Sequence, residues 1–533
     1  MSPSFIDLFC GCGGFTLGMQ RAGFKCVAAV DMNPEAIATL RSNIPDLPHV
    51  LERNLRSLRP EELARLVGHE RVDVIVGGPP CQGFSTARQV DGANHGKRLI
   101  LDRRRSLYRT FLRHVEYFRP SVFVMENVLG LRSAAGGAYF TEVQREARGL
   151  GYRVHAQIED AWELGVPQKR RRQLIIGVRS DVPGYFPSEL KAASSAMSRT
   201  MLGAAIGDLP ILRAGGGQMV RQYDLKRRSG HLHREGKPAE NYLNNVAQVD
   251  RTARLTNHLA RPHSARDLRD FARLREGENA AGAMRDRSIR FEFPYDKSKF
   301  KDRYTRQSRS AACSTIVAHL SKDGLMFIHP TQNRSLTPRE AARVQSFPDW
   351  FVFPPAQTHA FRLIGNAVPP LVAEAVGQEI RSFLENREAQ PGRTVFARFT
   401  LPESRDAALE KVVRFARASR RELREMTKEE FCSGWHALLF LLPGLHPDNA
   451  LDHGTKMNIA EVSWLGCSDE VRLLSRRFAR SGWPVALDHV GLEAWRRFDA
   501  EEIAEEQFYC VEAQMAGLSS GLSATEIRRK AVA

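Results

Sequence analysis

A short apolar run at 72–76 leads directly into Gly-Gly-Pro-Pro-Cys-Gln-Gly-Phe-Ser at 77–85. The run has the length and composition of a buried strand, so the segment that follows lies at the strand's carboxyl end. Open α/β sheets bind their ligands at that end. Two glycines allow close backbone approach, and Pro79 and Pro80 stiffen the turn that presents Cys81. This setting favours a covalent thiol nucleophile over a small buried cysteine.

The amino-terminal segment indicates a nucleotide-binding turn. A strand at 4–9, a glycine-rich turn at 10–14 and a helix at 15–22 follow one another. A second strand at 25–30 ends in Asp31, at the distance expected for a ribose-binding acid. The Walker lysine and serine pair is absent from this turn, so a nucleoside cofactor without a reacting phosphate fits better than phosphate transfer.

Two further segments bring charged residues to the predicted sheet. The apolar run at 121–125 ends in Glu126, which places a carboxyl at the same edge as Cys81. A helix cap is the simpler reading of an isolated glutamate, but its place beside the nucleophile favours a functional role. The basic run at 169–172 enters a strand at 173–178, where alternate side chains face opposite sides.

The composition limits the classes of protein to which the chain can belong. The chain has 533 residues and a formal net charge of +17, with eight cysteines in no metal-binding spacing, and we expect no metal site. Residues 211–310 hold 23 Lys and Arg against 12 Asp and Glu, which predicts that this region faces a polyanion. No apolar run has the length of a membrane span, and no secretory signal is present. We therefore expect a cytoplasmic protein with reduced thiols and no membrane partner.

The motifs, in their order and spacing, resemble those of the DNA cytosine-5 methyltransferases over residues 4–384. The matching segments are 7–15, 79–82, 126–128, the Gln-x-Arg-x-Arg set of Gln168, Arg170 and Arg172, 335–340 and 365–368. The resemblance implies a Rossmann-like α/β sheet that binds S-adenosylmethionine, with a smaller target recognition domain.

The resemblance also implies a domain layout. The catalytic domain is expected at 1–180, the target recognition domain at 181–330 and the return of the catalytic domain at 331–388. A linker at 386–404 precedes the tail at 400–533, which has a net charge of −3 from 401 on, helical periodicity and several tryptophans. We expect this tail to form a mainly helical domain that docks on the catalytic domain or binds a partner protein.

The resemblance assigns roles to individual residues. The implied catalytic residues are Cys81, Glu126, Arg170 and Arg172. The implied cofactor-binding residues are Phe9, Gly11, Gly13, Gly14, Asp31, Asn54, Pro79 and Asn366. Two of these depart from the family pattern, because Asp31 stands where glutamate is usual and Asn54 where aspartate is usual. Asparagine still offers a carbonyl acceptor, so cofactor binding is expected to survive.

The implied activity is methyl transfer to C5 of cytosine in a specific duplex DNA sequence, by base flipping and a covalent adduct between Cys81 and C6. The expected setting is a restriction or other defence system, with its cognate endonuclease or defence complex as a partner. Two alternatives remain open at this point: a tRNA cytosine-5 methyltransferase, and a catalytically silent DNA-binding regulator with the same fold.

Overall fold

The computed structural model describes residues 2–80, 107–133, 138–179, 182, 190–192, 199–249, 254–293 and 304–386. The predicted nucleophile Cys81 and the predicted helical domain at 400–533 lie outside these residues. Among the described helices, none is long and apolar enough to cross a membrane.

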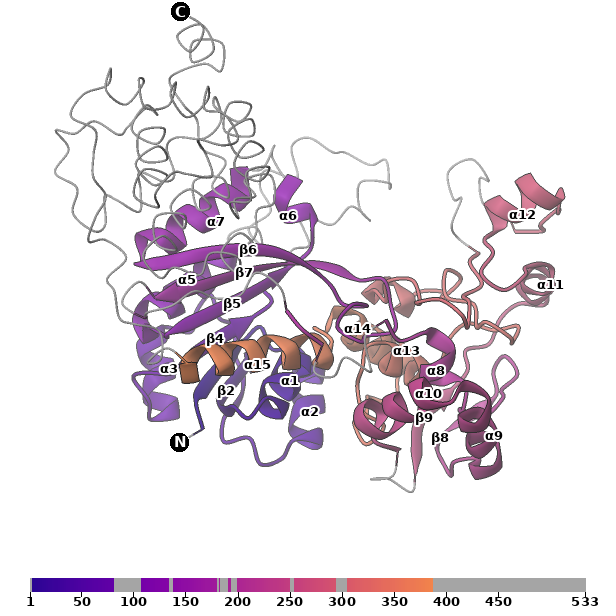
Figure 1. Ribbon diagram of the computed structural model, residues 1–533, viewed down its shortest axis with the longest axis horizontal. Coiled ribbons are helices and arrows are strands. Elements are labelled where there is room, and N and C mark those ends of the chain that lie inside the picture. Colours follow the sequence, from indigo (N-terminus) through magenta and orange to yellow (C-terminus); the bar gives the residue numbers. More distant parts are fainter. Residues whose placement is uncertain are drawn as a thin grey trace, which may run out of the picture.

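Seven strands form one mixed sheet in the order β3-β2-β1-β4-β5-β7-β6 (Figure 1). They are β1 (Ser4–Leu8), β2 (Lys25–Asp31), β3 (Val50–Glu52), β4 (Val74–Gly77), β5 (Val122–Asn127), β6 (Tyr152–Asp160) and β7 (Arg171–Arg179). Strands β1 to β5 are parallel, whereas β7 is antiparallel to both of its neighbours. The strand order changes direction between β1 and β4, the switch point where such sheets bind ligands.

Helices cover both faces of this sheet, as the predicted α/β class requires. Phe5 packs on one face and Ile6 on the other, because successive strand residues point to opposite sides. The first face is covered by α1 (Gly14–Arg21), α2 (Pro34–Asn43) and α15 (Pro370–Asn386). The second is covered by α3 (Pro60–Val67), α5 (Leu107–Phe118) and α7 (Ala138–Gly149), while the short α6 (Gly130–Ser133) follows β5. The sequence analysis did not predict β6, α3 or α7.

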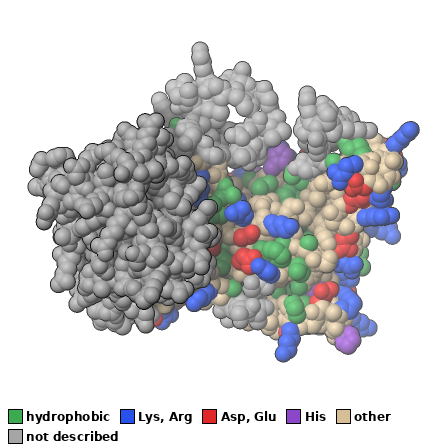
Figure 2. All heavy atoms as spheres, turned by 45° about the horizontal axis from the view of Figure 1, so that its top comes forward, with side chains coloured by type: hydrophobic (Ala, Val, Ile, Leu, Met, Phe, Trp, Pro, Cys, Tyr) green, Lys and Arg blue, Asp and Glu red, His purple; other side chains and the backbone are tan. Residues whose placement is uncertain are grey.

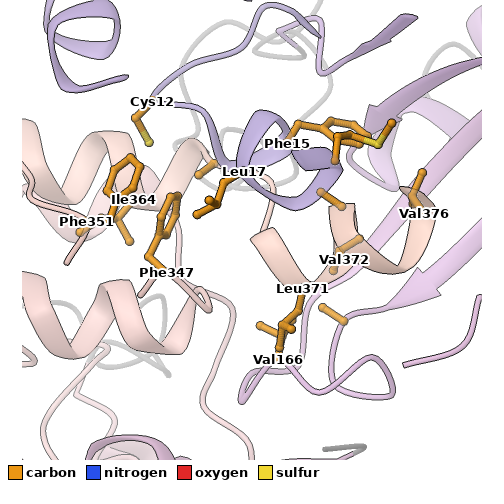
Figure 3. Close-up of a cluster of buried hydrophobic side chains, with 14 of the residues drawn as sticks. Cys12, Phe15, Leu17, Val166, Phe347, Phe351, Ile364, Leu371, Val372 and Val376 are labelled. Carbon is orange, nitrogen blue, oxygen red and sulfur yellow. The ribbon is translucent and has the colours of Figure 1, made fainter. Parts of the chain in front are cut away.

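Helices α1 and α15 pack closely although they lie far apart in the sequence. A Cβ at Gly18 would stand 2.4 Å from both the Ala373 Cβ and the Pro370 carbonyl oxygen. Phe15 and Leu17 of α1 belong to the same buried cluster as the apolar residues of α15 (Figure 3). Helix α15 is therefore held against α1 by close contact at a glycine.

A smaller lobe lies beside the carboxyl edge of the sheet, on the right of Figure 1. Its strands are β8 (Gly217–Arg221) and β9 (Leu255–Leu259), which pair antiparallel. Its helices are α8 (Leu202–Ile206), α9 (Leu225–Glu235), α10 (Lys237–Asn241), the π-helix η5 (Tyr242–Ala247), α11 (Ala265–Arg273), α12 (Ala280–Arg287) and the 3₁₀-helix η7 (Ala318–Ser321). Helices α13 (Pro338–Val344) and α14 (Gln357–Asn366) follow, and α13 packs against α8 and β9.

Acidic partners neutralise much of the positive charge that the sequence concentrates in this lobe. Arg269 lies 2.6 Å from Glu292, and Arg285 lies 2.6 Å from Asp286. Figure 2 shows Lys and Arg side chains interspersed with Asp and Glu along the right-hand margin of one face. These ion pairs leave unchanged the excess of basic over acidic residues in 211–310, and the contact of this region with a polyanion stays a prediction.

The contact between α1 and α15 gives a prediction for stability. Gly18→Ala is expected to lower the free energy of unfolding by about 1–3 kcal/mol, because the new methyl group meets backbone that cannot move aside. Urea denaturation measures the change. Gly149→Ala is the matched control, since a Cβ there meets no heavy atom within 4 Å and alanine favours a helix. Equal stability of the Gly18 variant and the wild type would contradict the packing argument.

Candidate active site

The carboxyl ends of four parallel strands meet along one edge of the sheet. Leu8 pairs with both Val30 and Gly77, and Gly77 pairs with Met125. The residues that follow these four positions lie side by side along this edge: Phe9, Asp31, Gly78 and Glu126. The structure thus brings together predicted site residues from the cofactor turn, the second strand and the acid motif.

The turn after β1 has a backbone that few residues other than glycine adopt. Phe9, Gly11 and Gly13 have φ angles of 60°, 54° and 91°. A Cβ at Gly13 would lie 2.4 Å from Leu40, and one at Gly14 would lie 2.1 Å from a backbone carbonyl oxygen. Among the described residues, a Cβ at Gly11 would meet no heavy atom within 4 Å. The turn is therefore packed tightly on its inner side, and Gly11 leaves space for a ligand to approach the backbone.

Asp31 anchors this turn to the end of β2. Its carboxylate accepts hydrogen bonds from the backbone N–H of Gly11 at 3.0 Å and of Asn33 at 2.8 Å. Burial raises the pKa of the Asp31 carboxyl, although these two hydrogen bonds act in the opposite direction. The predicted ribose-binding acid thus also has a structural role at the site.

Glu126 and Arg172 form a half-buried ion pair, with 3.1 Å between Oε1 and Nε. A Cβ at Gly78 would stand 3.5 Å from the Glu126 Oε2 atom. The Asn127 side-chain amide donates a hydrogen bond to the Pro79 carbonyl oxygen at 3.5 Å. The predicted acid and the predicted arginine therefore lie beside the segment that leads into the expected nucleophile.

The other two members of the Gln-x-Arg-x-Arg set hold distant segments together. Gln168 accepts a hydrogen bond from the Ile316 N–H at 2.9 Å. Arg170 is buried and donates to the carbonyl oxygens of Ile316 at 2.8 Å and Ala367 at 3.1 Å. Burial, followed by the charge of the nearby Arg172, lowers the pKa of Arg170 to about 9. In this structure Arg170 fixes the chain next to Asn366.

Asn54 and Asn366, two predicted cofactor residues, are both exposed. The Asn54 side-chain oxygen accepts a hydrogen bond from the Arg56 N–H at 3.1 Å, which uses its acceptor within a local turn. Asn366 is the last residue of α14. Their contacts with a cofactor stay predictions.

Two buried polar residues at this edge were not singled out from the sequence. Asp7 lies in β1 and accepts a hydrogen bond from the Thr16 hydroxyl at 2.7 Å. Asn127 follows Glu126 and holds Pro79. An acidic residue inside an otherwise apolar strand is a signal that could have identified Asp7.

The described cysteines are unsuited to nucleophilic chemistry. Cys10, Cys12, Cys26 and Cys313 are free and buried. Burial raises the pKa of each of these thiols, that of Cys12 to about 12. They stay protonated at neutral pH, whereas a nucleophile acts as the thiolate. Among the described residues, no group of His, Cys, Asp and Glu side chains could hold a metal ion.

Helix α13 carries a buried network of ion pairs. Arg343 pairs with Asp208 from the smaller lobe and with Asp349 at 2.6 Å, and all three side chains are inaccessible to solvent. Arg334 pairs with Glu340 at 2.7 Å. Burial alone would raise the pKa of Glu340, but the adjacent guanidinium of Arg334 holds it well below its usual range. This network holds α13 to the smaller lobe through Asp208.

The start of α13 is confirmed as predicted from the sequence. Thr337 is the N-cap and forms a capping box with Glu340, and Pro338 occupies the first turn. The Thr337 hydroxyl also contacts His258 Nδ1 at 3.1 Å, while His258 Nε2 contacts the Pro210 carbonyl oxygen at 2.8 Å. These contacts suit a neutral imidazole that donates through Nε2 and accepts through Nδ1.

The family comparison agrees with this geometry. The C-5 cytosine-specific DNA methylases match residues 3–382 of the chain. The chain belongs to this family. It is a DNA cytosine-5 methyltransferase, and enzymes of this family and fold use S-adenosylmethionine as the methyl donor.

Individual relatives support the assignment. The chain is 34% identical to the type II methyltransferase M.DdeI of Desulfomicrobium norvegicum, over 72% of this chain and 89% of the relative. It is 33% identical to the type II methyltransferase M1.HphI of Haemophilus parahaemolyticus, over 71% of this chain and 87% of the relative. A prophage-encoded E. coli protein, provisionally named a DNA modification methyltransferase, has a solved structure that matches with a TM-score of 0.55 and 28% identity. That match covers 72% of this chain and 100% of the solved chain.

The buried His258 gives a prediction for the pH dependence of stability. Burial lowers the pKa of His258 to about 4, below its value of about 6.5 in an unfolded chain. Between these values the unfolded state binds a proton that the folded state does not, so stability is lost as the pH falls. His258 is expected to contribute about 2 kcal/mol to the loss between pH 7.5 and pH 5.

Urea denaturation at both pH values measures this loss. His258→Gln is expected to be less stable at pH 7.5 but to lose less on acidification. His233→Gln, at an exposed position, is the matched control and should follow the wild type. If the His258 variant loses as much stability as the wild type between pH 7.5 and pH 5, protonation of His258 does not cause the loss.

Proposed function

We propose that this methyltransferase modifies C5 of cytosine in one duplex DNA sequence, with Cys81 as the nucleophile. The observation that carries the proposal is the ion pair of Glu126 and Arg172 beside Gly78. An acid and a guanidinium next to the segment that enters Cys81 supply the groups that a flipped cytosine requires. The defence role rests on the relatives, which are named as type II methyltransferases.

The residues at the sheet edge fit an S-adenosylmethionine site. Gly11 leaves its side of the turn open, and Asp31 presents a carboxylate beside it. Phe9, Gly13 and Gly14 shape the turn, and the buried Pro79 follows β4, the strand that pairs with β1. These residues would hold the cofactor, with Asn54 and Asn366 at its rim. When bound, the cofactor supplies an electrophilic methyl group.

The chain's own residues activate the base. The Cys81 thiolate adds to C6, which moves the electron pair of the C5–C6 double bond toward C5. Glu126 bonds N3 and the exocyclic amine, so that negative charge does not build up on the ring. Arg172 bonds the ring carbonyl. After C5 carries its methyl group, a base removes the C5 proton, the double bond re-forms and the thiolate leaves.

Two other features serve this chemistry indirectly. The reacting atoms are inaccessible inside a duplex, so the target base is flipped into the site. Arg170 acts as a positioning residue, since its guanidinium is used by the carbonyl oxygens of Ile316 and Ala367. The proposed target recognition domain at 181–330 supplies sequence selectivity, and the catalytic domain comprises 1–180 and 331–388.

A trapping experiment tests the nucleophile. Duplex DNA that carries 5-fluorocytosine in place of cytosine is expected to form a covalent complex with the wild type, because fluorine at C5 blocks the final elimination. Cys81→Ser should form none, and its methyl transfer should fall by more than about 10³-fold. Denaturing electrophoresis detects the complex, and labelled methyl groups measure the transfer.

Cofactor affinity is the internal control for this variant, because Cys81 lies outside the proposed cofactor turn. An equal loss of S-adenosylmethionine affinity would mean that the loop is structural. Methyl transfer into tRNA rather than duplex DNA would overturn the proposed substrate.

A second variant tests the acid. Glu126→Gln keeps the shape of the side chain but supplies neither charge nor proton, so turnover is expected to fall by about 10²-fold or more while DNA binding persists. Single-turnover methylation and DNA binding measure the two effects. Glu146→Gln is the matched control. Glu146 lies on α7, which covers one face of the sheet rather than its carboxyl edge, and it pairs with Arg109 at 2.9 Å. Near-normal turnover of the Glu126 variant would remove it from the mechanism.

A further inference from the structure

Asp7 lies directly beneath the cofactor turn. It is fully buried in β1, and its Oδ2 atom accepts a hydrogen bond from the Thr16 hydroxyl at 2.7 Å. Thr16 stands in the first turn of α1, three residues after the N-cap Gly13. One carboxyl therefore connects the strand before the turn with the helix after it.

The second oxygen of this carboxyl is unused. Among the described residues, Asp7 Oδ1 is buried and has no hydrogen-bond partner, although the Thr16 backbone N–H as well as its hydroxyl lowers the pKa of the carboxyl. A buried polar atom without a partner is costly and rare in native proteins, so it calls for an explanation. A negatively charged carboxyl in this position would be compensated by a cationic ligand above the turn.

The titratable side chains around Asp7 are acids and thiols rather than bases. The carboxyl of Asp31, and the thiols of Cys10, Cys12 and Cys26, are the titratable groups that interact with it. Among the described residues, no Lys or Arg pairs with Asp7 or Asp31. The basic residue of α1, Arg21, instead pairs with Glu374 of α15 at 3.7 Å.

We propose that Asp7 is a positioning residue for the cofactor that also makes the turn selective for a positively charged ligand. The buried Asp7 and the partly buried Asp31 place two carboxyls at one glycine turn, and no Lys or Arg of the described residues pairs with them. S-adenosylmethionine carries a sulfonium charge that its product, S-adenosylhomocysteine, lacks. The ionised form of Asp7 therefore favours the substrate over the product. This inference rests on the proposed cofactor site.

The proposal couples cofactor binding to one proton. Burial raises the pKa of Asp7 to about 7, and the nearby Asp31 adds to the rise. A ligand that prefers the ionised carboxyl releases this proton when it binds, so its affinity rises with pH through this range. S-adenosylhomocysteine shares the amino and carboxyl groups of the substrate, so it serves as the reference for their titration.

Calorimetric titration of the full chain without DNA tests the proposal. In the wild type, the ratio of S-adenosylmethionine affinity to S-adenosylhomocysteine affinity is expected to rise roughly threefold from pH 6 to pH 8. In Asp7→Asn the ratio should be independent of pH. At pH 8 it should be roughly fivefold lower than in the wild type, the effect of one nearby charge that solvent partly screens.

Thr16→Val provides an independent variant. It leaves the carboxyl in place but removes the hydroxyl that stabilises it, so the rise in the affinity ratio should shift to higher pH. Parallel pH profiles for the two ligands in the wild type would overturn the proposal, whatever the variants do. An Asp7→Asn ratio equal to that of the wild type at every pH would overturn it as well.

These outcomes are distinct from those that test the proposed function. A chain that binds S-adenosylmethionine but methylates no cytosine in duplex DNA contradicts the function and leaves the binding result intact. A chain that methylates DNA but shows no charge selectivity at Asp7 contradicts this inference alone.

Discussion

The structure depends on the buried ion pairs of α13. Arg343 joins Asp208 of the smaller lobe to Asp349, and Arg334 joins Glu340 within the capping box. Taking such charges out of water costs several kcal/mol for each ion, which only complete pairing offsets. Removal of one partner leaves an uncompensated buried charge. The pairing of Arg343 with Asp208 therefore holds α13 against the smaller lobe.

Hydrogen bonds to main-chain carbonyl oxygens connect the proposed active site with α13 and with the segment after α14. Gln168 donates to the Val344 carbonyl oxygen at the end of α13, and Arg170 holds Ala367 after α14. Both residues precede the strand that carries Arg172, which in turn pairs with Glu126. The same continuous stretch of sequence thus connects the packing of the lobes to the proposed chemistry. In this motif, Gln168 and Arg170 hold segments together, whereas Arg172 pairs with the proposed acid.

The sequence predicted the sheet edge better than it predicted the individual contacts. Apolar runs ending in Asp31 and Glu126 were enough to place both acids at one edge, because parallel strands end together. The use of Asp31 as an anchor for the Gly11 backbone was not visible, since that contact joins separate strands. Arg170 and Arg172 were both assigned to the site from the sequence, but their contacts differ: Arg170 is buried against main-chain carbonyl oxygens, whereas Arg172 pairs with Glu126. In the basic region, pairs such as Arg269 with Glu292 were also not visible, because the two residues lie in different segments.

By itself, the sequence determined the α/β class, the order of the family motifs and the cap of α13. These follow from short-range chemistry: apolar periodicity, glycine at positive φ, and a Thr-Pro start with glutamate three residues after the cap. Only the tertiary structure decided which polar residues are buried together. In the folded chain Arg343 pairs with Asp208, and α1 packs on α15 at Gly18. One carboxyl oxygen of Asp7, below the glycine turn, has no hydrogen-bond partner among the described residues. Such pairings depend on segments far apart in the chain, and local sequence patterns do not record them.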